Sequence, residues 1–264
     1  MGLKFDVNLS MLFQEAPFLD RFTRARNAGF KAVEYLFPYQ EDTKAIRARL
    51  DGLGLEQVLF NLHPGQANKE KVALGEWGTA SNPARRDYFR WSLSEALEVA
   101  QFLCCTRLNM MIGQRVEEIS PQEQFDCAVE NLNWALPMAQ DAGVTLMIEP
   151  LNDRDFPNYW IVKTEQAMEI INLIRHPNLK LQYDFYHAQI MEGNLEETVR
   201  KYFDAIGHIQ IADVPGRHEP GSGEIDFKTL FKTLEELGYE GYIGLEYRPS
   251  AGSEESLTWL AEYR

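Results

Sequence analysis

Sulfur chemistry and long apolar runs are both scarce in this chain. Its 264 residues include three cysteines: Cys104 and Cys105 are adjacent, Cys127 stands apart, and no CxxC pair exists. An odd number without metal-ligand spacing argues against a disulfide framework or a thiolate zinc site, and favours reduced thiols. No stretch approaches the roughly 18 apolar residues that a membrane span needs. We therefore expect a cytoplasmic protein with no membrane partner, and the start MGLKFDVNLS predicts no secretory signal peptide.

Positive charge is also in short supply. The 26 Lys and Arg residues face 40 Asp and Glu residues, which gives a formal net charge of -14. A surface this acidic repels phosphate backbones, so we expect no nucleic-acid partner. The same surface is compatible with a bound divalent cation, whereas an anionic substrate would need a local cationic pocket.

Linkers and low-complexity segments are missing as well, so residues 1–264 are predicted to form a single domain. Instead, one sequence pattern recurs along the chain. Each copy joins the end of an amphipathic helix, a glycine that can adopt the left-handed conformation, and an apolar run typical of a buried parallel strand. The copies are ARNAGFKAVEYLF, LDGLGLEQVLFNL, AQDAGVTLMIEPLN and LEELGYEGYIGLEY.

This pattern predicts eight strands, near residues 4–9, 31–36, 55–61, 106–112, 144–149, 179–184, 206–212 and 242–247. Helices are expected near residues 16–28, 41–52, 83–103, 121–141, 163–174, 194–204, 226–237 and 253–262. Ser120, Pro121 and Glu123 have the pattern of a capping box at one helix start. Strict strand–helix alternation implies a parallel α/β sheet, and eight units in about 260 residues match a (β/α)8 TIM barrel. A doubly wound open sheet is the alternative, disfavoured because no glycine-rich phosphate turn follows the first strand.

Polar residues stand at the carboxyl ends of the last four predicted strands, where a TIM barrel holds its active site. Glu149 ends TLMIE, Asp184 ends LKLQYD, Gln210 lies in GHIQIAD and Glu246 ends GYIGLE. One such residue alone would indicate a solvated strand end. Several carboxylates crowded in a low-dielectric funnel repel one another unless a cation or shared protons compensate. Three carboxylates and one amide oxygen suit a hard cation, Mg²⁺ or Mn²⁺.

Other polar residues near these strand ends have two interpretations each. His187 comes three residues after Asp184 and can point over the same funnel, or it can be a histidine satisfied within a loop. Arg217, in the polar loop ADVPGRHEPGSGEID, can clamp a substrate carboxylate through two hydrogen bonds, or form a surface salt bridge. His63 in NLHPGQ is a further substrate-binding candidate, with a structural role as its alternative. Trp77 in GEWG lines the mouth or packs in the core.

Several of these motifs together resemble the hydroxypyruvate isomerase family. They are LMIEPLN, LQYDFYHAQIMEGNL, HIQIADVPGRHEPGSGEIDF and YIGLEYRP, with NLSMLF and AVEYLFPY near the start. The resemblance covers nearly the whole chain and implies a xylose-isomerase-like barrel, in a superfamily that includes ketose 3-epimerases and an apurinic endonuclease. It implies that Glu149 and Glu246 are paired acid/base glutamates, and that His187 and Arg217 hold polar groups of the substrate. The metal ligands of the family match the four strand-end residues, Glu149, Asp184, Gln210 and Glu246.

The reaction implied by this resemblance interconverts hydroxypyruvate and tartronate semialdehyde, with the glutamates moving a proton between neighbouring carbons. The partner is then a small hydroxy-oxo acid, and a homo-oligomer stays open. A 2-oxo-tetronate isomerase or a ketose 3-epimerase is the alternative enzyme, and a metal- or sugar-acid-binding barrel is the alternative without catalysis. An endonuclease is disfavoured by the charge and by the shortage of histidine ligands.

Two loops depart from the pattern of the family. Gln66 stands where such enzymes commonly have an Asp after the third strand, and the fourth strand offers only Asn109 near its end. Because both loops shape the mouth of the pocket, the departures bear on which substrate is taken.

Overall fold

Parallel strands form one continuous sheet at the centre of the protein. The computed structural model describes residues 2–65 and 77–263, and the strands follow one another in the order β3-β2-β1-β9-β8-β7-β6-β5-β4. Every neighbouring pair in this order is parallel. Their bounds are β1 (Lys4–Asn8), β2 (Ala32–Glu34), β3 (Glu56–Gln57), β4 (Phe60–Asn61), β5 (Arg107–Asn109), β6 (Thr145–Ile148), β7 (Leu179–Asp184), β8 (Ile206–Ile211) and β9 (Tyr242–Leu245).

The two ends of the sheet meet within the third predicted strand. β3 pairs with β2, β4 pairs with β5, and only Val58 and Leu59 separate β3 from β4. Through this break the amide of Val58 donates to the Val33 carbonyl at 2.9 Å, and the amide of Asn61 donates to the Leu36 carbonyl at 2.8 Å. The sheet therefore closes into the predicted eight-stranded barrel, with its third strand split into two short segments.

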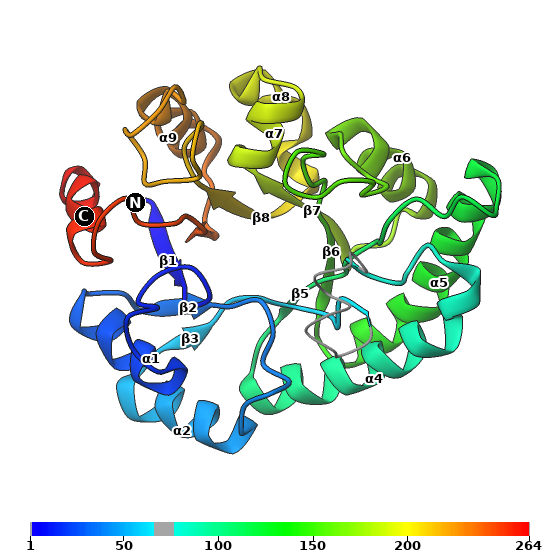
Figure 1. Cartoon of the computed structure of the whole chain (residues 1–264), viewed down its shortest axis with the longest axis horizontal. Helices are drawn as coiled ribbons and strands as arrows, with labels where there is room; N and C mark the ends of the chain where they lie inside the picture. Colours follow the sequence, from blue (N-terminus) through cyan, green and yellow to red (C-terminus); the bar gives the residue numbers. More distant parts are fainter. Residues whose placement is uncertain (1, 66–76, 264) are drawn as a thin grey trace.

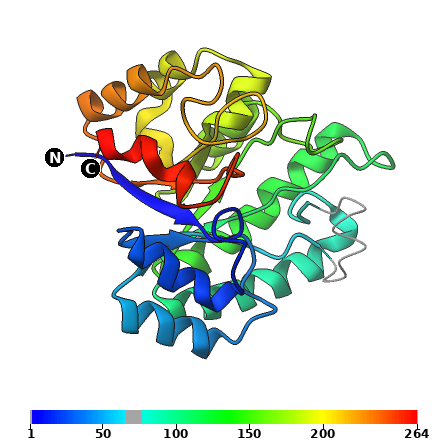
Figure 2. The same cartoon turned by 60° about the vertical axis from the view of Figure 1, so that its left-hand side comes forward.

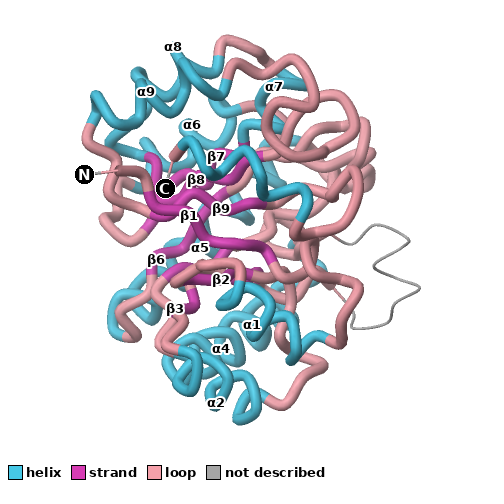
Figure 3. Tube along the Cα trace, turned by 90° about the vertical axis from the view of Figure 1, so that its left-hand side faces the viewer, coloured by secondary structure: helices cyan, strands magenta, loops and turns pink. Residues whose placement is uncertain are grey.

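Helices surround this barrel, as Figure 1 shows. In the tube of Figure 3 the strands run between α1, α2 and α4 on one side and the helices around α7 to α9 on the other. Among the described helices, none has the length and apolar character that crossing a bilayer requires. Apart from α7, which directly follows β7 and is described below, the α-helices of the described residues are α1 (Phe18–Asn27), α2 (Thr43–Leu53), α4 (Arg86–Leu103), α5 (Pro121–Asp141), α6 (Thr164–Ile174), α8 (Leu195–Tyr202) and α9 (Phe227–Leu237). The 3₁₀ segments within residues 2–65 and 77–263 are η1 (Pro83–Arg85), η2 (Phe203–Ala205) and η3 (Glu255–Glu262).

The helix starts bear out one local prediction closely. The amide of Glu123 donates to the Ser120 hydroxyl at 3.2 Å, and the amide of Ser120 donates to the Glu123 carboxylate at 2.9 Å. Both halves of the predicted capping box at the start of α5 are thus present.

Two further elements differ from the prediction. α7 (Phe185–Met191) follows β7 without a loop, because Asp184 accepts a hydrogen bond from the amide of Tyr186 at 2.8 Å and so caps a new helix. The helix predicted near residues 253–262 is the 3₁₀ segment η3. Its Trp259 ring packs edge-on against Phe5 of β1 with ring centroids 5.7 Å apart, so η3 lies beside β1 in Figure 2.

Alternate residues of each strand face the helices or the barrel axis, as the two-residue period of a strand requires. On β8, Ile209 and Ile211 belong to the hydrophobic core around the barrel. The alternate residues, His208 and Gln210, contact Glu34. The side-chain nitrogen of Gln210 donates to the Glu34 carboxylate at 2.7 Å, and His208 Nε2 lies 2.7 Å from the same carboxylate. The barrel interior therefore has a polar middle layer. A separate small apolar cluster inside the sheet consists of Ala32, Val58, Leu59 and Met147.

Candidate active site

Four oxygen-bearing side chains lie at the carboxyl ends of four adjacent strands. Glu149 directly follows β6, Asp184 ends β7, Gln210 lies in β8 and Glu246 directly follows β9. Asp184 and Gln210 are direct partners in the sheet register. All four are buried, with exposed fractions of 5%, 2%, 1% and 5% in chain order. The structure therefore brings the predicted strand-end residues to one mouth of the barrel, where TIM-barrel enzymes carry their active sites.

Arg217 bridges two of these carboxylates. Its Nη2 atom lies 3.3 Å from Glu246 Oε1 and 3.7 Å from Asp184 Oδ2, and its guanidinium stands 5.0 Å from the centre of the Tyr186 ring. With 6% of Arg217 exposed, the alternative of a surface salt bridge is wrong. A buried cation placed between carboxylates reduces their repulsion, and its planar fork suits a further carboxylate.

The loop that carries Arg217 is tied down by a single buried side chain, Asp213. Its Oδ1 atom accepts hydrogen bonds from the amides of Val214 and Ile225, and its Oδ2 atom accepts from Gly221 and Gly223, all within 3.1 Å. The backbone of Arg217 is left-handed, with φ of 58°, an unusual conformation for a residue with a side chain. The network around Asp213 holds the loop in the shape that this conformation requires.

His187 extends from α7 toward the same group, as the funnel interpretation expects, and its role in binding substrate stays a prediction. Its Nε2 atom lies 3.5 Å from Asp184 Oδ2. Its Nδ1 atom lies 3.1 Å from the backbone nitrogen of Asn152 and 2.7 Å from the Asn152 side-chain nitrogen. Burial, and then the charge of Arg217, lower the pKa of His187 well below its usual value, so the ring is neutral.

Burial raises the pKa of all three carboxyls at the mouth. For Glu149 the rise is large, and the neighbouring Glu246 and Asp184 add to it. Burial raises the pKa of Glu246 to about 8, against the opposing effect of Arg217. It raises the pKa of Asp184 to about 6, again opposed by Arg217. Raised carboxyl pKa values are typical of groups that exchange protons at neutral pH.

The donor set fits a divalent cation. Glu149, Asp184 and His187 each offer a ligand atom within 4.8 Å of the others. Asp184 Oδ2 is buried and accepts no hydrogen bond from the residues that the structure describes, so it has an unused lone pair beside a second carboxylate. Gln210 is oriented by its neighbours: its nitrogen donates to Glu34 at 2.7 Å, and its oxygen accepts from Gln182 at 2.5 Å. That oxygen keeps a second lone pair for a metal.

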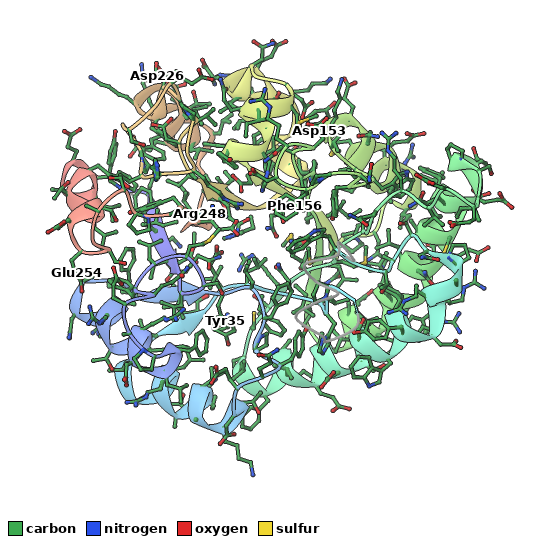
Figure 4. The ribbon with its side chains drawn as sticks, in the orientation of Figure 1. Tyr35, Asp153, Phe156, Asp226, Arg248 and Glu254 are labelled. Carbon is green, nitrogen blue, oxygen red and sulfur yellow. The ribbon has the colours of Figure 1, made fainter. Side chains whose placement is uncertain are left out.

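Aromatic rings adjoin the same mouth. Phe156 packs edge-on against His187 with centroids 5.6 Å apart, and Trp77 packs edge-on against Phe156 at 4.8 Å. Figure 4 shows Phe156 and Arg248 toward the middle of the view, whereas Asp226 and Glu254 lie at its outer edge. Trp77 is therefore joined to the site through Phe156, and it also packs against the hydrophobic core, so its contacts fit both interpretations.

His63 has its contacts elsewhere. Its Nε2 atom lies 2.9 Å from Glu95 of α4, and its ring stacks on Tyr39 at 3.5 Å and tilts against Trp91 at 5.0 Å. These contacts suit the structural alternative, and a substrate-binding role for His63 stays a prediction. Gln66, the departure in the loop after the third strand, lies outside the described residues.

Several side chains that shape the site were not singled out from the sequence. Asn152 and Asp155 follow Glu149 in the loop after β6, Tyr186 lies under Arg217, and Asp213 holds the Arg217 loop. Asn and Asp near a strand end are ordinary loop residues, so only their proximity to Glu149 within EPLNDRD could have indicated a role. Asn109, noted as the only polar group near the end of its strand, donates to Glu149 at 2.5 Å.

Known proteins with similar sequences extend over the full chain. The sequence profile of the xylose isomerase-like TIM barrel family matches residues 22–263. A 2-oxo-tetronate isomerase from Cupriavidus necator is 43% identical over 260 residues, which cover 98% of each chain. The hydroxypyruvate isomerase of Escherichia coli is 40% identical over 262 residues, which cover 99% of this chain and 100% of the relative.

Solved structures agree with this fold. One described as an AP endonuclease, family 2, from Brucella melitensis superposes with a TM-score of 0.94 at 41% identity and covers 100% of both chains. A D-psicose 3-epimerase from Clostridium cellulolyticum gives a TM-score of 0.80 at 18% identity over 99% of both chains, a likeness in fold alone. The predicted (β/α)8 barrel is confirmed.

Proposed function

The chain belongs to the xylose isomerase-like TIM barrel family and is an isomerase, and from that premise we propose that it acts on hydroxypyruvate or a close 2-oxo acid. The observation that carries this proposal is the buried group formed by Glu149, Asp184, Glu246 and Arg217. It combines carboxyls of raised pKa with one buried cation. A small anionic substrate that exchanges protons at carbon needs both.

Conversion of hydroxypyruvate to tartronate semialdehyde removes one proton from C3 and delivers one to C2, while the hydroxyl proton passes from O3 to O2. Glu149 and Glu246 stand at the ends of β6 and β9, with β7 and β8 between them. Two carboxyls on separate strands can flank a bound molecule, one taking the proton from carbon and the other returning a proton to the neighbouring carbon. Which of the two acts first depends on the substrate face that each one meets.

Arg217 is positioned to hold the substrate carboxylate. Its contacts to Glu246 and Asp184 run through Nε and Nη2, and a guanidinium has five N–H donors in one plane. Among the described residues of the site, Arg217 is the only cation. An anion bound here lies beside that positive charge, which favours a monoanionic acid over a neutral sugar. His187 adds a second polar contact from α7.

A divalent ion would be held by Glu149, Asp184, Gln210 and Glu246, and oxygen donors of this kind suit Mg²⁺ or Mn²⁺. When bound, it stabilises negative charge that develops on the substrate oxygens. The residues of the chain then do the rest: Arg217 fixes the acid end, the barrel excludes water, and the two glutamates move the protons.

A four-carbon substrate is the second candidate. Relatives named 2-oxo-tetronate isomerase are 38–43% identical to the chain, nearly the same range as the 38–42% of those named hydroxypyruvate isomerase or putative hydroxypyruvate isomerase, so both names support a candidate substrate. Both substrates present the same 2-oxo acid group to Arg217. They differ in the carbons beyond it, which the loops at the mouth would contact.

A substrate panel tests the proposal. Metal-stripped protein is reloaded with Mg²⁺ or Mn²⁺ and given hydroxypyruvate, 2-oxo-tetronate and neutral ketoses, with products identified by NMR. We expect turnover of one or both oxo acids, dependence on the metal, and loss of turnover in Glu149→Gln. Turnover of ketoses with none of the oxo acids would contradict the proposed substrate class.

A further inference from the structure

The ring of His187 meets two hydrogen-bond donors at one nitrogen. The backbone N–H of Asn152 donates to Nδ1 at 3.1 Å, and the Asn152 side-chain nitrogen lies 2.7 Å from the same atom. A backbone N–H can only donate, so Nδ1 must present its lone pair. A neutral imidazole then carries its single proton on Nε2, the atom that lies 3.5 Å from Asp184 Oδ2.

The orientation of the Asn152 amide does not depend on a choice between its oxygen and its nitrogen. Its Oδ1 atom accepts hydrogen bonds from the backbone amides of Arg154 at 3.1 Å and Asp155 at 2.8 Å. Its Nδ2 atom lies 3.1 Å from the carboxylate of Asp155. The two backbone amides can only donate, so the atom that they contact is the oxygen. The atom beside the Asp155 carboxylate is then the nitrogen, and this nitrogen also faces His187.

We propose that Asn152 is a positioning residue that holds His187 in the Nε2–H tautomer, so that His187 donates a hydrogen bond into the site and does not ligate the metal. That the acceptor of this His187 hydrogen bond is a substrate oxygen rests on the proposed function. The tautomer itself rests only on the contacts of Asn152. Asn152 is 0% exposed and His187 2% exposed, so water does not compete for these contacts.

The consequence concerns the three residues whose ligand atoms come within 4.8 Å, Glu149, Asp184 and His187. A histidine that binds a metal through Nε2 normally donates its other ring N–H to an acceptor. Here the environment of Nδ1 supplies donors only. If Nε2 bound the metal, the ring proton would have to move to Nδ1 or leave the ring. A proton on Nδ1 would face two N–H donors, and its loss would give an imidazolate, so both outcomes are unfavourable. The ion is left to the carboxylates and Gln210.

A double substitution can weaken the preference for the Nε2–H tautomer while keeping the loop. In Asn152→Asp, one carboxylate oxygen still accepts from the amides of residues 154 and 155, and the other faces Nδ1 in place of the nitrogen. Adding Asp155→Asn avoids two facing carboxylates and restores a donor–acceptor pair between residues 152 and 155. Asp155→Asn alone is the matched control, because its amide oxygen can still accept from Asn152. A carboxylate beside Nδ1 stabilises a proton on that nitrogen, because a charged acceptor makes a stronger hydrogen bond, and it opposes the backbone N–H of residue 152 that still donates to Nδ1.

Nitrogen-15 NMR of the histidine side chains in the metal-free protein measures the tautomer directly, with His187→Gln used for assignment. We expect a protonated Nε2 and an unprotonated Nδ1 in the parent and in Asp155→Asn. In the double variant we expect a measurable population with the proton on Nδ1, because the carboxylate there competes with the remaining backbone donor. Loading the parent with Zn²⁺, which favours imidazole, should leave Nε2 protonated. A parent spectrum with the proton on Nδ1, or a zinc-induced loss of the Nε2 proton, overturns the inference even if the double variant fails to fold.

Activity gives a second and separable readout. For the metal-loaded double variant we expect kcat/KM on the preferred oxo acid to fall about tenfold to hundredfold, as for loss of one buried hydrogen bond, while Asp155→Asn loses much less. A tautomer population shifted toward Nδ1–H with unchanged kcat/KM would refute the positioning role. A parent that shows the expected tautomer but turns over no oxo acid would contradict the proposed function and leave the tautomer assignment supported.

Discussion

The metal-free protein should become less stable as the pH rises through neutrality. Burial raises the pKa of Glu246 from 4.5 to about 8 and that of Asp184 from 3.8 to about 6, and it raises the pKa of Glu149 well above 4.5. In the unfolded chain these groups titrate near their ordinary values. Between the two values of each group, the folded state holds a proton that the unfolded state has already released, so rising pH favours unfolding.

The magnitude follows from the number of extra protons. Each one lowers the free energy of unfolding by about 1.4 kcal/mol per pH unit within its window. The contribution of Asp184 is complete by about pH 6 and that of Glu246 by about pH 8. The lowered pKa of His187 opposes the decline below about pH 6.5, because the unfolded imidazole binds a proton there that the folded ring does not, so the decline should be clearest between about pH 6.5 and 8. For Glu246 alone the upper bound is several kcal/mol, at roughly 1.4 kcal/mol for each pH unit between its two values.

Urea unfolding at pH 5, 6, 7 and 8, with a chelator present, measures this decline. Glu246→Gln removes one of the shifted groups, so the variant should gain stability relative to the parent as the pH rises. Glu98→Gln makes the same chemical change at an exposed position of α4 and should follow the parent. Mg²⁺ or Mn²⁺ should flatten the decline, because an ion that binds only the folded, deprotonated site adds stability. A stability that rises or stays level from pH 7 to 8 in the metal-free parent, with no gain in Glu246→Gln, would refute the reasoning.

Three further outcomes are expected. Glu149→Gln and Glu246→Gln should each slow isomerisation by about 10²–10⁴-fold, and NMR in D₂O should find one of them still exchanging the C3 hydrogen of hydroxypyruvate without forming product. Arg217→Lys should raise KM for oxo acids nearly as much as Arg217→Ala, because Lys lacks the fork, and steady-state kinetics that show parent-like KM would contradict the clamp. Asp213→Ala leaves four backbone amides without their acceptor, so urea unfolding should show a loss of about 1–3 kcal/mol or more; an unchanged midpoint would mean that water replaces the carboxylate.

Much of the barrel could be predicted because its signals are local. The glycine at the end of a helix and the apolar run after it specify a helix–strand junction within a dozen residues, and the capping box at Ser120 marks its helix start to the residue. The break between β3 and β4 could not be predicted in this way. The run EQVLFN has the composition of one strand, and the break depends on how its two halves pair with β2 on one side and β5 on the other.

α7 shows why the region after β7 was missed. The segment FYHAQIM has two aromatic residues and a histidine at its start, which predict a helix only weakly. The helix forms because Asp184 caps it, and Asp184 had already been interpreted as a metal ligand at a strand end. One carboxylate serves both purposes: Oδ1 accepts the amide of Tyr186, and Oδ2 faces the site. A single sequence position cannot reveal that its two oxygens have different partners.

The strand-end candidates, Arg217 and His187 lie together at one mouth, whereas His63 has its contacts elsewhere. The positions of Glu149, Asp184, Gln210 and Glu246 follow from counting to the end of each strand, since parallel strands end at the same edge. The contacts of His63 with Glu95, Tyr39 and Trp91 depend on where α4 packs, about which the local sequence carries no information.

The buried carboxyls of Glu149 and Glu246 destabilise the folded protein, and this destabilisation is an argument that they serve catalysis. A barrel that only held a cation could do so with fewer buried carboxyls, and each buried charge without a partner destabilises the folded chain. Here Glu149 and Glu246 both stand buried at the mouth, with Arg217 offsetting only part of their repulsion. Replacing either by Gln should stabilise the metal-free protein at pH 8 and abolish turnover in the metal-loaded one. Opposite effects of the same substitution on stability and on catalysis would show that both carboxyls are retained for chemistry, and a variant that loses stability along with activity would show that they are retained for the fold.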